Sequence, residues 1–270
     1  MSSGIDFKPK VSITHIGTAT AILEIDDVRF LTDPFFSPAG TTWDVGITIL
    51  KNTEDPALRL DQLPPIDAVL LSHEDHPDNL DELGRRLLDG RQVFTTMDGA
   101  KNLAPRPAVV GMKPWDTVER RIGGKVFRIT ATPCQHLPGG ECIGFLVSSD
   151  DFGFGPNNLP NANYFTGDTV FIEELTKIAN RFHVPIAMMN LGFAHVQLPD
   201  MDTPLQITMD GKKAARLFRE IKADQLVPMH YDKSWGHFTQ FEEGLAKDFK
   251  DEGVDDKVKW LKPGVPVEII

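Results

Sequence analysis

The stretch Ser72-His73-Glu74-Asp75-His76-Pro77-Asp78-Asn79-Leu80-Asp81 places two histidines and several carboxylates directly after the apolar run 66–71. Leucines at helical spacing follow, so a helix should begin here with Asp78 or Asn79 as its N-cap. Side chains at a strand-to-helix turn point into one small volume, which is the geometry that a divalent metal needs from nitrogen and oxygen ligands. The same pattern also fits a polar surface turn with a good cap, and the rest of the chain has to decide between these two interpretations.

The composition indicates an acidic globular chain. Its 270 residues are 41% hydrophobic, enough to bury a full core, and we expect residues 1–270 to form a single domain with two halves. The net charge of −11 and the dispersed Lys and Arg residues argue against a nucleic-acid partner. Residues 1–11 lack an apolar signal segment, no long apolar run exists, and Cys134 and Cys142 make no disulfide framework. We therefore expect a soluble, cytoplasmic protein without a membrane partner.

Apolar and alternating runs predict two sets of strands and helices. The strands at 11–16, 19–25 and 28–32 should form an antiparallel meander, and residues 35–65 should form a long loop of the kind that often acts as a lid. Further strands are expected at 66–71, 92–96, 117–122, 125–131, 142–148, 163–166, 184–191, 225–229 and 258–261, and helices around 79–88, 172–182, 214–221 and 238–249. Because strands followed by βα units occur twice, we expect two halves that pack sheet against sheet with helices outside.

Histidine and aspartate residues recur at the C-terminal ends of four predicted strands. Ligands from strand ends converge on one edge of the sheets in such an arrangement. A set of three or four histidines with two or three carboxylates suits one or two zinc ions, with iron or manganese as alternatives. Each residue alone is compatible with a structural role, so the metal prediction depends on their joint occurrence. The candidates are His73, Asp75, His76, Asp78, His136, Asp168 and His230.

With these motifs the chain resembles the metallo-β-lactamase fold superfamily over almost its full length. The matching pieces are residues 14–20 with 31–34, the His73 segment, 132–136, 165–169 and 228–231. The branch that looks closest holds lactonase-like and phosphodiesterase-like hydrolases, similar to ascorbate-6-phosphate lactonase and N-acyl-phosphatidylethanolamine phospholipase D. The resemblance implies an α/β (α+β) fold, a four-layer αββα sandwich with the metals at one edge.

One motif departs from the family pattern, which is His-x-His-x-Asp-His followed in this branch by Leu-Asp. Aligned on Leu80-Asp81, the chain keeps three ligands, but it has one inserted residue after His73, and Asn79 takes the place of the last histidine. Aligned instead on Asp75-His76, the chain has Leu71 in place of the first histidine. We prefer the first register because it keeps more ligands.

In the preferred register, the resemblance implies a role for each ligand. The first ion would be held by His73, His76 and His136 and the second by Asp78 and His230, with Asp168 bridging the two. Asn79 is a poorer ligand than imidazole, so the second site should be weak or empty unless Asp75 or His237 substitutes. His15 resembles a recurrent family position beside the site.

Metal-activated water is the expected nucleophile. The chain has no Gly-x-Ser-x-Gly elbow, and neither cysteine has a motif for covalent catalysis. A bound metal lowers the pKa of its water towards neutrality. Asp78 would orient this water and pass its proton to the leaving group, with His237 or His15 as second candidates.

The expected substrate is a small cyclic ester or amide, that is, a lactone or lactam. The acidic surface argues against RNA, and the absence of an amphipathic or basic anchor argues against a membrane phospholipid. The alternatives are a phosphodiesterase of the same fold and a non-catalytic metal- or ligand-binding protein. The sequence leaves open a homo-oligomer. Substrate contacts are expected from Phe35, Phe36, Trp43, Phe193, His195 and Trp235.

Overall fold

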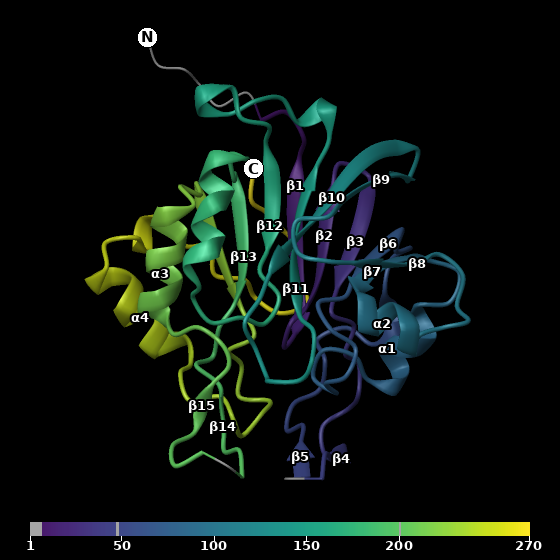
Figure 1. Ribbon diagram of the computed structural model, residues 1–270, viewed down its shortest axis with the longest axis vertical. Coiled ribbons are helices and arrows are strands. Elements are labelled where there is room, and N and C mark those ends of the chain that lie inside the picture. The colour runs from purple at the N-terminus through teal and green to yellow at the C-terminus, as the bar shows by residue number, and fades with distance from the viewer. Residues whose placement is uncertain (1–6, 47–48, 200) are drawn as a thin grey trace.

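The computed structural model describes residues 7–46, 49–199 and 201–270. Two predictions fall partly outside these ranges, namely the absence of a signal segment in residues 1–11 and the long loop at 35–65, which contains residues 47–48. Within the described residues, two β-sheets face each other at the centre of the molecule and helices lie on both outer sides (Figure 1). The predicted αββα sandwich is confirmed.

The first sheet is mixed. Its strands in spatial order are β17 (Val267–Glu268), β1 (Val11–Gly17), β2 (Thr20–Ile25), β3 (Val28–Thr32), β6 (Ala68–Leu70), β7 (Gln92–Thr96) and β8 (Val109–Met112). The meander β1–β2–β3 is antiparallel, whereas β3, β6, β7 and β8 pair in parallel. Parallel neighbours need long crossover connections, and the helices α1 (Glu82–Leu87) and α2 (Met97–Asn102) lie in two of them.

The second sheet has the same mixed character. Its strands in spatial order are β16 (Gln225–Met229), β13 (Ile186–Asn190), β12 (Ala162–Phe165), β11 (Ile143–Ser148), β10 (Lys125–Pro133) and β9 (Thr117–Ile122). The parallel strands β12, β13 and β16 are joined through η4 (Glu173–Asn180), which is a 3-10 helix, and α3 (Gly211–Glu220). The last α-helix, α4 (Glu242–Asp251), packs against α3. The short 3-10 turns are η1 (Leu60–Gln62), η2 (Asp150–Phe152), η3 (Pro156–Asn158) and η5 (Asp255–Lys257).

The central strands are buried on both faces, which explains their almost continuous apolar sequences. In β13, Ile186 and Met188 enter the core between the sheets, while Ala187 and Met189 face the helices. Phe30 of the first sheet meets Phe127 of the second edge to face, with ring centroids 5.1 Å apart. Truncating such a ring to alanine costs about 3–5 kcal/mol, so contacts of this kind hold the two sheets, and everything at their shared edge, in register.

Three details of the sequence-based prediction were wrong. The N-cap of α1 is Asp81, whose Oδ1 accepts from Gly84 N at 2.6 Å, because the side chains of Asp78 and Asn79 are engaged elsewhere. Residues 258–261 form no strand; only Val258 makes a bridge, to Leu226, and the C-terminal strand is β17, which pairs with β1. The prediction also missed α2 and β8 in the segment 97–112.

The long loop at 35–65 carries structure that the sequence did not reveal. It contains a short antiparallel hairpin, β4 (Thr42–Asp44) and β5 (Ile49–Lys51). A second small hairpin, β14 (His195–Val196) and β15 (Leu205–Gln206), projects from the same end of the molecule (Figure 1). In the part of the chain that the structure describes, no helix has the length and apolar character to cross a bilayer.

Candidate metal centre

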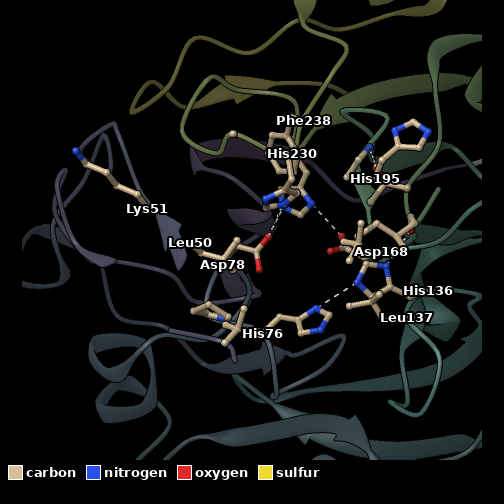
Figure 2. A pocket seen from close by; sticks show the side chains of 18 of the residues that line it. Leu50, Lys51, His76, Asp78, His136, Leu137, Asp168, His195, His230 and Phe238 are labelled. Atoms are coloured by element: carbon tan, nitrogen blue, oxygen red, sulfur yellow. Dashed lines mark hydrogen bonds and ion pairs between the residues drawn. The ribbon is translucent and has the colours of Figure 1, made fainter. Parts of the chain in front are cut away.

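The predicted ligands lie at the ends of strands from both sheets. His73, His76 and Asp78 follow β6 of the first sheet, while His136, Asp168 and His230 follow β10, β12 and β16 of the second. These side chains face one another around a cavity of about 860 Å³, between the two small hairpins (Figure 2). His73 is the exception, since it is not among the residues that line the cavity and is 1% exposed. Since each sheet supplies part of the set, the centre exists only when the two sheets are packed together.

His73, His76 and His136, called the three-histidine cluster below, bring their ring nitrogens within 4.8 Å of one another. His76 Nδ1 lies 2.9 Å from His73 Nε2 and 3.2 Å from His136 Nε2. Burial lowers the pKa of His73 and of His136, and the neighbouring imidazoles lower both further. All of these effects favour neutral rings, the form of imidazole that binds a metal.

In His136 and His73, the ring nitrogen outside the cluster makes a hydrogen bond that fixes the tautomer. This tautomer decides whether the nitrogen inside the cluster carries a lone pair. His136 Nδ1 lies 2.9 Å from the carbonyl oxygen of Ile207, an acceptor, so this nitrogen donates and Nε2 carries the lone pair. Ser72 Oγ donates to Asp33 Oδ2 at 2.7 Å, so the hydroxyl oxygen, 2.8 Å from His73 Nδ1, accepts from that ring. His73 Nε2 therefore also points a lone pair into the cluster.

This donor set fits a divalent metal ion. Two inward lone pairs meet His76 Nδ1, which has at most one proton to give, so at least one lone pair has no donor within the cluster. Three imidazole nitrogens are also a recurrent ligand set of catalytic zinc.

Asp78, Asp168 and His230, called the acidic cluster below, lie on the other side of the same cavity. His230 Nδ1 is 2.9 Å from Asp168 Oδ1, and His230 Nε2 is 3.5 Å from Asp78 Oδ2. Burial alone would lower the pKa of His230, but the two carboxylates raise it well above its usual value. Burial likewise raises the pKa of Asp78 and of Asp168, yet the neighbouring histidines hold both well below the usual range. Both carboxylates are therefore charged at neutral pH.

His230 is held in place by its backbone as well as by its ring. Its φ is 57°, in the left-handed region that few non-glycine residues occupy, and its N–H donates to the carbonyl of Thr18 at 3.0 Å. Gly192 (φ 86°) passes so close that an added Cβ would lie 2.6 Å from the carbonyl oxygen of His230. The chain thus accepts local backbone strain where this imidazole is presented.

A buried carboxylate that the sequence analysis did not single out supports the three-histidine cluster from below. Asp33 accepts from the backbone N of Ser72 at 2.6 Å, from Ser72 Oγ at 2.7 Å and from Asn79 Nδ2 at 2.9 Å. Burial and the charge of Asp168 raise the pKa of Asp33 to about 7, although the donors from Ser72 and Asn79 lower it. Asp33 directly follows β3, so the strand-end rule used for the other candidates would have found it.

The remaining motif residues lie in different surroundings. Leu71 is buried in the apolar cluster behind the first sheet. The alternative register would therefore put, at the position of the first histidine ligand, a residue that faces away from the site. Asp75 is an exposed residue on the wall of the cavity. His15 is buried outside the cavity lining, with Nε2 2.9 Å from the carbonyl oxygen of Thr18, and burial lowers its pKa.

Of the six residues predicted to contact substrate, only His195 is among those that line this cavity. The aromatic residues instead pack on one another beneath it. Phe35 and Trp43 each lie with ring centroids 5.4–5.9 Å from their neighbours in a group centred on Trp235, which is 1% exposed. The two others not found in the lining are Phe36, which is buried against the first sheet, and Phe193, which packs edge to face on His195. The prediction of direct contact is corrected for these five, because large aromatic side chains gain more from burial than from lining a wet cavity.

The cavity walls that the sequence analysis missed come mainly from the two small hairpins. The first hairpin region contributes Val45, Ile49, Leu50, Lys51 and Thr53, and the second contributes Ala194, Val196 and Gln197. Their signal in the sequence was weak, because strands of two or three residues leave no detectable period.

Comparison with known proteins identifies the family. A family model of the beta-lactamase superfamily domain matches residues 28–231, and the chain therefore belongs to the beta-lactamase superfamily. The predicted membership is confirmed.

Individual relatives are distant. An uncharacterized protein of Mycobacterium tuberculosis is 28% identical over 243 residues, which cover 85% of this chain and 59% of that protein. A protein of Methanopyrus kandleri named as a UPF0173 metal-dependent hydrolase is 24% identical, covering 95% of this chain and 99% of its own. The mitochondrial N-acyl-phosphatidylethanolamine-hydrolyzing phospholipase D of Saccharomyces cerevisiae is 26% identical, covering 83% of this chain and 47% of its own. The chain thus spans well under two thirds of the length of the first and third of these relatives.

Among solved structures, the isothiocyanate hydrolase from Delia radicum gut bacteria superposes with a TM-score of 0.75. The two share 21% identity, and the match covers 95% of this chain and 98% of that one. At 21% sequence identity, this similarity is evidence for a shared fold alone.

Proposed function

We propose that the protein is a metal-dependent hydrolase that attacks a small lactone or lactam with an activated water. The observation that carries this proposal is the three-histidine cluster, in which His73 and His136 point lone pairs at a common centre beside a large cavity that His76 and His136 line. The names of several relatives as metal-dependent hydrolases support it. Zinc is the proposed ion because three imidazoles suit it, with manganese or iron as alternatives.

His73, His76 and His136 would hold this ion. When bound there, the ion would supply Lewis acidity and a water of lowered pKa. Asp78, which is ionised and lines the cavity, would accept a hydrogen bond from the water, orient it and take up its proton. Asp168 is fixed for its part by His230 Nδ1 and by Asn190 Nδ2 at 2.7 Å, both on Oδ1. Its charge compensates the positive charge at the centre.

His237 was also predicted to transfer a proton during catalysis. This role and a role as metal ligand exclude each other, because both would use Nε2. This atom lies 3.6 Å from Asp78 Oδ2, inside the cavity.

The cavity favours a partly apolar substrate. A volume of about 860 Å³ is in the range of pockets for drug-sized molecules. Leu50, Leu137 and Phe238 are among the apolar side chains in its wall. Lys51 also lines the cavity, but it extends away from the His and Asp side chains (Figure 2). Among the described lining residues, Lys51 is the single lysine or arginine, so an anionic phosphodiester at the centre would meet little positive charge from side chains. This is why we rank the phosphodiesterase alternative below the lactonase.

The proposal is tested by metal content and turnover on the same protein. The full chain, purified without added metal, is analysed for metal per chain and assayed on a panel of lactones, lactams, an aryl isothiocyanate and a chromogenic phosphodiester. Asp78→Ala should abolish turnover, whereas Asp75→Ala, an exposed carboxylate on the same cavity wall, should retain it.

Each result bears on the proposal. Turnover of a lactone or lactam together with bound metal supports it, and turnover of the phosphodiester alone supports the phosphodiesterase. Metal without turnover on any class indicates a binding protein. A chain that takes up no metal even after supplementation overturns the hydrolase proposal.

A further inference from the structure

Asn79 stands where the family pattern has its last histidine, yet its side chain is engaged away from the acidic cluster. Its Nδ2 donates to Asp33 Oδ2 at 2.9 Å, and the residue is 0% exposed. Asp33 in turn fixes Ser72 behind His73. Asn79 therefore belongs to the support of the three-histidine cluster, and the acidic cluster needs another donor if it is to hold an ion.

His237 reaches the acidic cluster from a different part of the chain, the loop after β16. Its Nε2 lies 3.6 Å from Asp78 Oδ2, and His230 Nε2 lies 3.5 Å from the same oxygen. Hydrogen bonds between such atoms span about 2.7–3.2 Å, so these atoms converge without bonding to one another. Tetrahedral zinc with bonds of about 2.0–2.2 Å separates its ligand atoms by roughly 3.3–3.6 Å. Both separations from Asp78 Oδ2 are close to the second spacing. Binding of one ion by both imidazoles would also require the two rings to move closer together, because among the described residues only His73, His76 and His136 form a group of donors that all lie within 4.8 Å of one another.

The two imidazoles also have unused ring nitrogens. Among the described residues, His230 Nε2 is buried and has no hydrogen-bond partner, whereas the partnerless nitrogen of His237 is Nδ1 and not the Nε2 that lies near Asp78. His230 Nδ1 already donates to Asp168 Oδ1, so Nε2, which faces Asp78, is the ring nitrogen left to bind an ion in exchange for its proton.

The position of His237 is well supported by its neighbours. The ring of Phe238 packs edge to face on both His230 and His237, with centroids 4.7 Å away in each case. The backbone of His195 donates to the carbonyl of His237 at 3.3 Å, and Thr53 N donates to Ser234 O at 2.9 Å. These contacts tie the loop to both hairpins. Side chains held in this way present a ligand at low entropic cost.

We propose that His237 replaces the histidine missing at Asn79 and, with Asp78, Asp168 and His230, holds a second divalent ion beside the three-histidine cluster. This inference rests on the proposed function, because it assumes a metal centre in the same cavity. Two carboxylates and two imidazoles balance the charge of a divalent ion, and Asn79 keeps its structural contact with Asp33. The motif with the inserted residue after His73 thus lacks one histidine ligand, and His237 from the loop after β16 supplies it.

The test measures metal binding and not turnover. Wild type and variants are stripped, titrated with Zn²⁺ at buffered free concentrations and analysed for ions per chain, and a parallel Co²⁺ titration follows the visible absorption of each site. Wild type should bind two ions. His237→Ala should keep the first ion and weaken the second roughly 100-fold, since a ligand is lost. His195→Ala, a histidine of the same cavity wall, should bind two ions as wild type does.

The outcomes separate this inference from the proposed function. Two ions in His237→Ala with unchanged affinity overturn the inference. In that case, loss of the second ion in Asn79→Ala, with an unchanged melting curve, would assign the ligand to Asn79 Oδ1, which lacks a partner among the described residues. One ion in wild type, abolished by His136→Ala, overturns the inference alone. No ion at all overturns the proposed function as well.

Discussion

The three-histidine cluster and the acidic cluster lie at the same cavity, yet the pKa values of His73 and His136 in the first and of His230 in the second are shifted in opposite directions. In the first, burial and mutual repulsion lower the pKa of His73 and His136. In the second, Asp168 and Asp78 raise the pKa of His230 despite its burial. Charge at this centre is therefore set by the partner that each ring meets. The first cluster offers neutral nitrogens, and the second offers the negative charge that balances an ion.

Removing a ring from the three-histidine cluster should have the largest effect. His136→Ala removes one of the three ring nitrogens, so we expect loss of the ion from this cluster and a fall in turnover of at least about 10³-fold. Metal analysis and kcat measure the two effects, and a melting curve excludes unfolding. Full metal content in this variant would show that the cluster is not the metal site.

Neutralising the acidic cluster should have the next largest effect. Asp78→Asn keeps the shape of the side chain but removes its charge, so turnover should fall by roughly 10²–10³-fold while the three-histidine cluster keeps its ion. Asp75→Asn, on the same cavity wall, provides the matched control and should change turnover little. Equal losses in both variants would mean that general charge in the cavity matters, and not the position of Asp78.

The support beneath the three-histidine cluster should appear in the pH dependence of the metal-free protein. Burial raises the pKa of Asp33 to about 7, above its value in the unfolded chain, so the stability it contributes is present at about pH 4 and is lost as the pH rises to about 7. The slope is at most about 1.4 kcal/mol per pH unit. Denaturant unfolding of chelator-treated wild type should show this loss, and Asp33→Asn should remove it.

Asp26 gives a control of opposite sign for that measurement. Burial raises its pKa, but hydrogen bonds from Lys125 and from the backbone of Lys10 leave it below the usual value. Its contribution should therefore be present at neutral pH and be lost below about pH 4. If Asp33→Asn and Asp26→Asn changed the pH profile in the same direction, the assignment to Asp33 would be wrong.

The smallest effect is expected for the hairpin residues that line the cavity, called the cavity rim below, because they belong to neither cluster. Ile49 lines the cavity and is 68% exposed, so Ile49→Ser should raise KM a few-fold and leave kcat, metal content and stability nearly unchanged. A surface change of this kind usually shifts stability by less than about 0.5 kcal/mol. A clear loss of metal in this variant would contradict the separation of rim and centre.

Much of the fold could be predicted from the sequence because its signals were local. Continuous apolar runs identify strands buried on two faces, and the strand-end histidines and aspartates identify the edge where the structure brings them together. The superfamily and the sandwich are confirmed on this basis. The roles of individual ligands remain predictions for the experiments above.

What failed depends on tertiary context. Asp81 rather than Asp78 caps α1, because Asp78 turns towards His230 and His237, which are far away in sequence. The C-terminal strand pairs at 267–268 with β1, a contact that no local pattern announces. Aromatic residues near the site, such as Trp235, looked like substrate contacts, but they form the packed support of the cavity wall.

The two small hairpins, β4–β5 and β14–β15, project from one end of the molecule (Figure 1) and contribute residues to the cavity lining, whereas the predicted ligands follow core strands. Mutation and drift can therefore remodel the rim without disturbing the groups that do the chemistry. A lineage built on this scaffold can acquire new substrates by exchanging hairpins of a few residues. Laboratory evolution of this chain should accordingly begin at the hairpin residues that line the cavity, among them Val45, Ile49, Leu50, Val196 and Gln197.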